Sequence, residues 1–168
     1  VIGHERDDQI RRSVPTTPKR VFIAGGGPAG MTVAITAADR GHHVILCEKT
    51  DELGGAIKFA KHVSFKKNVD KLNEHLKYLV TKAKIDVRLN TEVTPDYARY
   101  LKPDVIVAAL GSRPIKPPVD GIDGANVMSA VKAYANPDQA GDKIVILGGG
   151  LAGIELAIYM SKLGRKAT

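Results

Sequence analysis

The sequence predicts an α/β fold in which a parallel sheet carries helices on both faces. Three observations predict it: short apolar runs lead directly into glycine-rich turns, amphipathic helical segments separate these runs, and one strand–turn–helix pattern occurs twice in 168 residues. The apolar content of 43% supplies the core of one ordinary domain with little left over for a second. We therefore expect one sheet domain and the start of another.

The first strand–helix–strand unit runs from about Arg20 to Glu48. Val21 to Ala24 form an apolar strand that runs into glycines, and residues 29–39 carry apolar side chains at helical spacing. A second apolar run, Val44 to Cys47, returns to the sheet. These runs are apolar throughout because a parallel sheet is covered on both faces.

The next segments extend the same sheet. From Lys66 to Ala83 the apolar positions keep helical spacing and predict an amphipathic helix that lies on the sheet. A third strand follows from Ile85 to Leu89, and a short helix near 96–101 leads to a fourth parallel strand at 105–110. The fourth strand, VIVAAL, is an apolar run that requires cover on both faces. The strand order expected for this Rossmann-like arrangement is about 3-2-1-4.

The rest of the chain follows a connector. Residues 111–124 hold three glycines and three prolines, too many for a helix or a central strand. A short helix near 128–134, a strand at 143–147 and a helix at 152–163 follow. Because the sheet partners of that strand are expected beyond Thr168, we expect it to pair with the edge of the first sheet or with another copy of the chain. The predicted organisation is an N-terminal arm at 1–18, a Rossmann-like domain at 19–124, and a connector with the truncated start of a second such domain at 125–168.

Composition excludes several classes of function. The net charge is +7, but the basic residues are spread along the chain and only eight side chains, five Tyr and three Phe, are aromatic, so we expect no nucleic-acid interface. A local excess at Lys58, Lys61, Lys66 and Lys67 could steer an anionic dinucleotide or acyl carrier, but a solvated helix surface is the favoured interpretation. No apolar run approaches the roughly 20 residues of a membrane span, so we expect a cytoplasmic protein without a membrane segment.

Catalytic and metal-binding side chains are not expected in this chain. Its single cysteine, Cys47, excludes an internal disulfide and any multi-cysteine metal site. The five histidines show no pairing with an acid or a nucleophile that would indicate catalysis.

The loop GGGPAG after the first strand has the spacing of a dinucleotide-binding turn. Gly25 permits the tight turn, Gly27 lets the backbone approach a pyrophosphate, and Gly30 lets the helix pack closely on the strand. Pro28 suits the first helical turn, where a missing N–H has no intrahelical partner. The free N–H groups of that turn then face the phosphates.

Glu48 ends the second strand 23 residues after Gly25. At this place a carboxylate can accept hydrogen bonds from both hydroxyls of an adenosine ribose, and it would repel a 2′-phosphate. The first site is therefore expected to prefer FAD, NAD or ADP to NADP.

The same pattern of small residues recurs 123 residues later. Chance does not account for five positions in register, so the repeat predicts a second dinucleotide loop. Gly25, Gly27, Gly30, Ala34 and Gly41 recur as Gly148, Gly150, Gly153, Ala157 and Gly164. The residue that corresponds to Glu48 would be position 171, so the second site is expected to be incomplete within these 168 residues.

Several motifs together resemble one family of flavoenzymes. They are VFIAGGGPAGMTVAITAADRGHHVILCEK, LGGAIKFAK, NTEVT, ALGSRPIKPPVDGID and VILGGGLAGIELA, and the GHE of the N-terminal arm agrees with them. The span from Lys19 onward resembles the C-terminal, FAD/NAD(P)-binding half of the NADH:flavin oxidoreductases related to old yellow enzyme. This family includes 2,4-dienoyl-CoA reductase, 2-enoate reductase, NADH oxidase and trimethylamine dehydrogenase.

The resemblance implies a set of cofactor-binding residues. At the first site, FAD or ADP would be held by Gly25, Gly27, Pro28, Ala29, Gly30, Glu48, Lys49, Gly54, Gly55, Val93 and Gly111. At the second, incomplete site, NADH or NADPH would be held by Gly148, Gly150, Gly153 and Glu155. Thiol chemistry is not implied, because no cysteine pair follows Gly55.

The resemblance also implies that the chain is part of a larger enzyme. In such a parent, hydride would pass from NAD(P)H to FAD, and electrons would continue through a 4Fe–4S cluster to FMN and an enone-like substrate. The FMN-binding barrel and the iron–sulfur region lie outside this chain, so the chain alone is expected to be inactive. Two alternatives remain open: a structural ADP-binding module, as in trimethylamine dehydrogenase, and an electron-transfer subunit like the small subunit of glutamate synthase.

Overall fold

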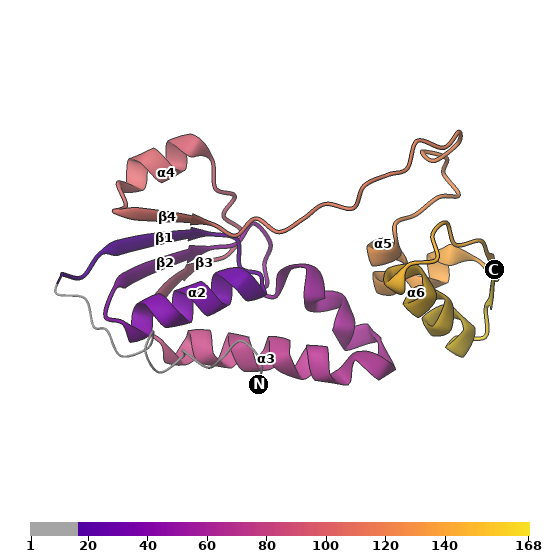
Figure 1. The fold of residues 1–168 in the computed structure, drawn as a ribbon, viewed down its shortest axis with the longest axis horizontal. Coiled ribbons are helices and arrows are strands. Elements are labelled where there is room, and N and C mark those ends of the chain that lie inside the picture. Colours follow the sequence, from indigo (N-terminus) through magenta and orange to yellow (C-terminus); the bar gives the residue numbers. More distant parts are fainter. Residues whose placement is uncertain (1–16) are drawn as a thin grey trace. The chain divides into compact units, whose positions relative to one another are not determined.

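A computed structural model describes residues 17–168, which divide into two compact units (Figure 1). The first unit ends at Lys58 and resumes over Asn68–Gly111, and the second comprises Phe59–Lys67 and Ser112–Thr168. Most of the predicted N-terminal arm, including its GHE motif, lies outside the described residues.

The first unit is built on a four-stranded parallel sheet. Its strands are β1 (Arg20–Ala24), β2 (His43–Cys47), β3 (Ile85–Arg88) and β4 (Val105–Ala108), in the order β3-β2-β1-β4. The register pairs Val21 of β1 with Val44 of β2 on one side and with Val105 of β4 on the other. The predicted α/β class and the order 3-2-1-4 are both confirmed.

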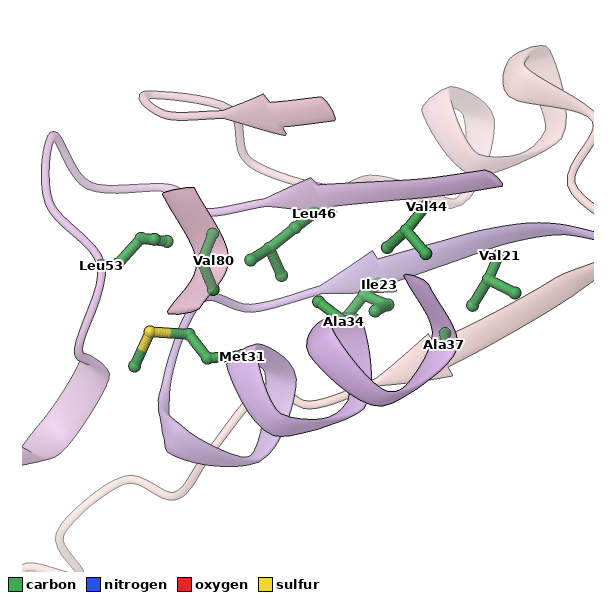
Figure 2. Close-up of a cluster of buried hydrophobic side chains, with 9 residues drawn as sticks. All are labelled: Val21, Ile23, Met31, Ala34, Ala37, Val44, Leu46, Leu53 and Val80. Carbon is green, nitrogen blue, oxygen red and sulfur yellow. The ribbon is translucent and has the colours of Figure 1, made fainter. Parts of the chain in front are cut away.

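Helices cover both faces of this sheet, as predicted. The helices α2 (Pro28–Asp39) and α3 (Lys67–Lys82) lie on one face, and α4 (Pro95–Leu101) lies on the other (Figure 1). Alternate residues of a strand point to opposite faces, and the buried side chains therefore form two clusters. The larger cluster contains Val21, Ile23, Met31, Ala34, Ala37, Val44, Leu46, Leu53 and Val80 (Figure 2), and the smaller contains Phe22, Cys47 and Ala98.

The fourth strand differs from its prediction. It ends at Ala108, and it is not covered on both faces, because Val105 is 37% exposed and Ile106 is 54% exposed. The expectation of full cover for the run at 105–110 is therefore wrong in this structure. Within the described sheet β4 is an edge strand that pairs with β1 alone, so fewer neighbouring side chains surround it.

The second unit contains short elements around a cluster of its own. The segment 59–67 contributes the second half of η1 (Gly55–His62) and all of η2 (Ser64–Lys66), both 3-10 helices. The later elements are α5 (Ala130–Ala135), η3 (Pro137–Ala140), β5 (Lys143–Ile144), α6 (Leu151–Lys162) and β6 (Lys166–Ala167). Their buried side chains are Val63, Ala133, Tyr134, Leu156, Tyr159 and Met160.

The last predicted strand finds a partner inside the chain. β5 pairs in parallel with β6, and the N–H of Ile146 donates to the carbonyl of Thr168 at 2.8 Å. The expectation that all sheet partners of the 143–147 strand lie beyond Thr168 is therefore wrong. β6 is only two residues long, and a tight turn at Gly164 brings it back beside β5 so that the two strands pair. Pairing with another copy of the chain stays a prediction.

Among residues 17–168, none of the helices is both long enough and apolar enough to cross a membrane.

Candidate functional site

The first glycine loop joins β1 to α2 and has a shape that side chains would prevent. Gly25 has φ +107°, and a Cβ there would overlap the carbonyl oxygen of Ala109 at the end of β4. A Cβ at Gly30 would overlap the carbonyl oxygen of Gly25 itself. Gly25 therefore makes the tight turn, and Gly30 lets the helix begin close to the strand, which are the structural roles predicted for each.

The start of α2 is open toward solvent and lacks a side-chain cap. Gly27 is the N-cap residue, with φ −74° and ψ −178°, and it offers no side chain to the first-turn N–H groups. Pro28 follows at the first helical position, and Ala29 is exposed. A helix of 12 residues whose first N–H groups are uncapped presents a partial positive charge to an anion.

The Gly54–Gly55 turn packs against this loop. The N–H of Gly54 donates to the carbonyl of Gly26 at 2.8 Å, and a Cβ added at Gly55 would lie 2.8 Å from the Cα of Gly27. Both turn glycines have positive φ, +123° for Gly54 and +55° for Gly55. The structure thus brings the two predicted glycine segments into direct contact.

Asn73 of α3 supports the turn and was not predicted as a site residue. Its side chain is 3% exposed, and a Cβ at Gly54 would lie 2.7 Å from its Oδ1. Among the described residues, this Oδ1 has no hydrogen-bond partner. The sequence held one signal that could have identified Asn73. It lies three and seven residues before Leu76 and Val80, on the helix face where an apolar residue is expected.

Glu48 is held by backbone donors of two segments. Its Oε2 accepts the N–H of Gly26 at 2.8 Å, and its Oε1 accepts the N–H of Thr50 at 2.9 Å. The residue is 7% exposed. Burial acts to raise the pKa of this carboxyl, but the donors from Thr50 and Gly26 outweigh it and hold the pKa below its ordinary value. Glu48 therefore stays ionised at neutral pH and ties the glycine loop to the end of β2.

A lysine interpreted from the sequence as solvated belongs to the same network. Lys58 Nζ donates to the Thr50 hydroxyl at 3.0 Å and to the carbonyl of Glu52 at 3.3 Å. The Thr50 hydroxyl in turn lies 3.0 Å from Glu48 Oε1. No sequence spacing could have indicated this arrangement, since it depends on how the loop after β2 folds back on itself.

Of the remaining predicted residues of the first site, Val93 lies on a segment that is hydrogen bonded to Glu48. The N–H of Thr91 donates to the carbonyl of Glu48 at 2.9 Å, which places the segment leading to Val93 beside the end of β2. The side chain of Val93 packs on the smaller core cluster. Lys49 and Gly111 are exposed, and Gly111 has φ +71°.

The second glycine loop repeats the local geometry of the first. Gly148 has φ +116°, and a Cβ at Gly153 would overlap the carbonyl oxygen of Gly148. Gly150, the N-cap residue of α6, has φ −75° and ψ 177°. The surroundings differ, because a Cβ at Gly148, Gly149 or Gly150 would meet no atom within 4 Å.

Glu155, the acid predicted for the second site, is engaged within its own unit. It forms an ion pair with Lys66, and both side chains are about one-fifth exposed. Beside this pair, Phe59 stacks on Tyr134 with ring centroids 5.0 Å apart, and Tyr134 lies 5.2 Å from Tyr159. The segment 59–67 is thereby fixed to α5 and α6.

Cys47 is fully buried, and burial raises the pKa of its thiol despite the lowering effect of Arg88, so the reactive thiolate is disfavoured. Within residues 17–168, no group of three or more His, Cys, Asp or Glu side chains is arranged to hold a metal ion.

The known proteins that this chain resembles in sequence are oxidoreductases. The profile of the family described as pyridine nucleotide-disulphide oxidoreductase matches residues 19–168. The chain is 36% identical over 157 residues to an NADH oxidase of Thermoanaerobacter brockii, covering 89% of this chain and 24% of the relative. It is 33% identical over 166 residues to a cinnamate reductase of Clostridium sporogenes, covering 99% of this chain and 24% of the relative.

A solved structure agrees with these sequence matches. A 2-naphthoyl-CoA reductase, in complex with 2-naphthoyl-CoA, superposes with a TM-score of 0.91 at 32% identity, over 99% of this chain and 25% of that protein. The chain thus spans about a quarter of the length of each of these relatives. The resemblance to the NADH:flavin oxidoreductases related to old yellow enzyme is confirmed.

Proposed function

The chain belongs to the pyridine nucleotide-disulphide oxidoreductase family, and from that premise we propose that it is the dinucleotide-binding part of a flavin-dependent NAD(P)H oxidoreductase. The first glycine loop would bind FAD, or ADP, and the second would bind NADH or NADPH. The observation that carries the first assignment is the open, uncapped start of α2 beside the buried Glu48 carboxylate. The former suits a pyrophosphate and the latter a ribose hydroxyl.

The residues present fit the adenosine diphosphate half of such a cofactor. A Cβ at Gly27 would meet nothing closer than the Cα of Gly55 at 3.8 Å, so a space next to the backbone stays free for a ligand. Neither backbone group of Val93 is hydrogen bonded among the described residues, and these groups are candidates for contact with an adenine. When bound, a flavin supplies hydride acceptance, whereas this chain binds and orients the dinucleotide.

The proposed parent enzyme is larger than this chain. The names NADH oxidase and cinnamate reductase support a parent that oxidises NAD(P)H and reduces an enone-like substrate. FMN and a 4Fe–4S cluster would then lie in the three quarters of the parent that this chain does not span. We expect the 168-residue chain with added FAD to consume no NADH.

Substitution at Gly27 tests the first site. Gly27→Ala should fold normally, because φ −74° suits alanine and the nearest atom is in ordinary contact, yet its methyl group would occupy the approach of a pyrophosphate. We expect at least tenfold weaker binding of ADP and FAD by titration calorimetry, with an unchanged melting temperature. The matched control is Gly149→Ala, at a position where a Cβ meets no atom within 4 Å. Full ADP affinity in the Gly27 variant would contradict the assignment.

A structural ADP-binding module is the second candidate. One observation favours it. The hydrogen-bonded and tightly packed part of the site consists of the glycine loop and Glu48, and these residues would bind only the adenosine diphosphate half that FAD and ADP share. A flavin absorbance band that stays with the purified chain after reconstitution would support FAD. Tight binding of ADP without retention of FAD would support the module.

A further inference from the structure

We propose that Lys58 is a positioning residue for ribose recognition at the first glycine loop. Its ammonium orients the Thr50 hydroxyl, and that hydroxyl fixes the Glu48 carboxylate in the position from which it accepts a ribose hydroxyl. This inference rests on the proposed function of the first loop. It adds a residue that the glycine pattern and the predicted ribose acid do not include.

The direction of the hydrogen bonds follows from the chemistry of the groups. A lysine ammonium can only donate, so the Thr50 oxygen, 3.0 Å from Lys58 Nζ, must accept. The single hydroxyl proton of Thr50 is then left for one of two acceptors at 3.0 Å, Glu48 Oε1 or the carbonyl of Glu52. Lys58 already donates to that carbonyl, at 3.3 Å, whereas a carboxylate is the stronger acceptor. The proton therefore points to Glu48.

The contacts around Glu48 leave a defined place for a ligand. Its Oε1 accepts both the N–H and the hydroxyl of Thr50, and among residues 17–168 its Oε2 accepts only the N–H of Gly26. A carboxylate offers about four lone-pair sites, two on each oxygen. The lone pair that remains is on Oε2, on the side of the glycine loop. One ribose hydroxyl can bind there without displacing a protein donor.

The stem of Lys58 is fixed by the Gly54 turn. A Cβ at Gly54 would lie 2.8 Å from Lys58 Cγ, so the aliphatic chain passes directly over the turn glycine. Gly54 is itself hydrogen bonded to Gly26, whose N–H contacts Glu48. The lysine, the turn and the carboxylate thus form one connected unit, in which loss of the ammonium frees the Thr50 hydroxyl to turn toward Glu52.

The test compares ADP with 2′-deoxy-ADP and 3′-deoxy-ADP in binding to the 168-residue chain. We expect the wild-type chain to discriminate about tenfold against one of the two deoxy analogues, as is typical of a hydrogen bond to a charged acceptor. Lys58→Met should reduce this factor to about twofold, and Lys58→Arg, which keeps a donor-only cation, should restore most of it. Thr50→Val should have the same effect as Lys58→Met, with no further loss in the double variant. Lys71→Met, an exposed lysine of α3, is the control for charge alone and should keep the wild-type discrimination.

The outcomes separate the inference from the function on which it rests. A wild-type chain that binds neither ADP nor FAD overturns both. A wild-type chain that binds and discriminates, together with a Lys58→Met variant that discriminates equally well, overturns the role of Lys58 alone. Equal weakening of all three nucleotides by Lys58→Met also overturns it, because that pattern indicates a direct contact with phosphate.

Discussion

The two glycine loops share one local conformation and differ in what surrounds them. Their N-cap glycines, Gly27 and Gly150, agree within about 5° in both backbone angles, at φ −74° and ψ −178° against φ −75° and ψ 177°. Around the first loop, however, stand Leu53, Ala109 and the Gly54 turn, whereas the glycines at 148–150 have open space on the side where a Cβ would stand.

This difference teaches that a glycine pattern encodes a turn and not a binding site. The turn follows from local sterics, because a positive φ and a close helix start exclude side chains wherever the pattern occurs. The site requires partners from elsewhere in the chain: the end of β4, the segment after β2, and α3. Only the first loop has them among the described residues.

The largest expected effect separates the two loops by stability. Gly25→Ala and Gly148→Ala both place alanine at positive φ, which costs each variant about 1–2 kcal/mol. Only at Gly25 does the new methyl group also overlap a backbone atom, the carbonyl oxygen of Ala109, which adds about 3 kcal/mol. Hydrogen exchange of the β1 amides in the first variant and of the α6 amides in the second measures each local loss.

A pair of substitutions at positions without positive φ serves as the control for this comparison. A Cβ at Gly26 would lie 2.5 Å from Leu53 Cδ2 and 2.9 Å from Glu48 Cβ, whereas a Cβ at Gly149 meets nothing within 4 Å. Neither residue has positive φ. Gly26→Ala should therefore destabilise its unit by about 1–2 kcal/mol, while Gly149→Ala stays within about 0.5 kcal/mol of wild type. Equal losses in the two variants would show that the second loop is enclosed as well.

The comparison also explains which features the sequence could predict. Strand order, helices on both faces and the repeated turn all follow from residue periodicity and from the spacing of Gly25 and Gly30, which are local properties. Full cover of the 105–110 run did not follow. The apolar pattern indicates that Ile106 prefers a buried environment, whereas its 54% exposure depends on which side chains pack around β4.

The two site residues that the sequence did not predict were missed for the same reason. Asn73 and Lys58 act through contacts across 19 and 8 residues of chain, with the Gly54 turn and with Thr50 respectively, and no motif relates those positions. The partner of β5 was missed because two-residue β6 is too short to give a periodic signal.

A second prediction concerns the acid that ties the first loop to its sheet. In Glu48→Gln an amide group replaces one of two oxygens that both accept backbone N–H groups, so one donor loses its acceptor. We expect a loss of about 2 kcal/mol in the free energy of unfolding of the first unit at pH 7. The native pKa of Glu48 is lowered, so its stabilising contribution is complete above the ordinary glutamate pKa, about 4.3. It disappears as the pH falls below that value through the lower native pKa.

Urea unfolding of wild type and Glu48→Gln at several pH values between 7 and 2.5 measures this dependence. The two stability curves should converge on the acid side, because the wild-type carboxyl is then protonated as well. A constant difference at every pH would mean that the substitution acts through packing and not through the charge of Glu48. The second loop has no such carboxylate among residues 17–168, so Gly149→Ala should show no corresponding change of pH dependence.

The smallest effect concerns how the second loop is held. Its helix, α6, is anchored by the ion pair between Glu155 and Lys66. Both side chains are only about one-fifth exposed, so their coupling should exceed that of a fully solvated pair and reach about 1 kcal/mol. A double-mutant cycle of Lys66→Met and Glu155→Gln, followed by hydrogen exchange of the α6 amides, measures it. The coupling should fall at 1 M salt, since a partly exposed pair is screened. A coupling near zero would mean that the aromatic stack of Phe59 on Tyr134 anchors the segment 59–67 without the ion pair, and that the second loop depends on apolar packing alone.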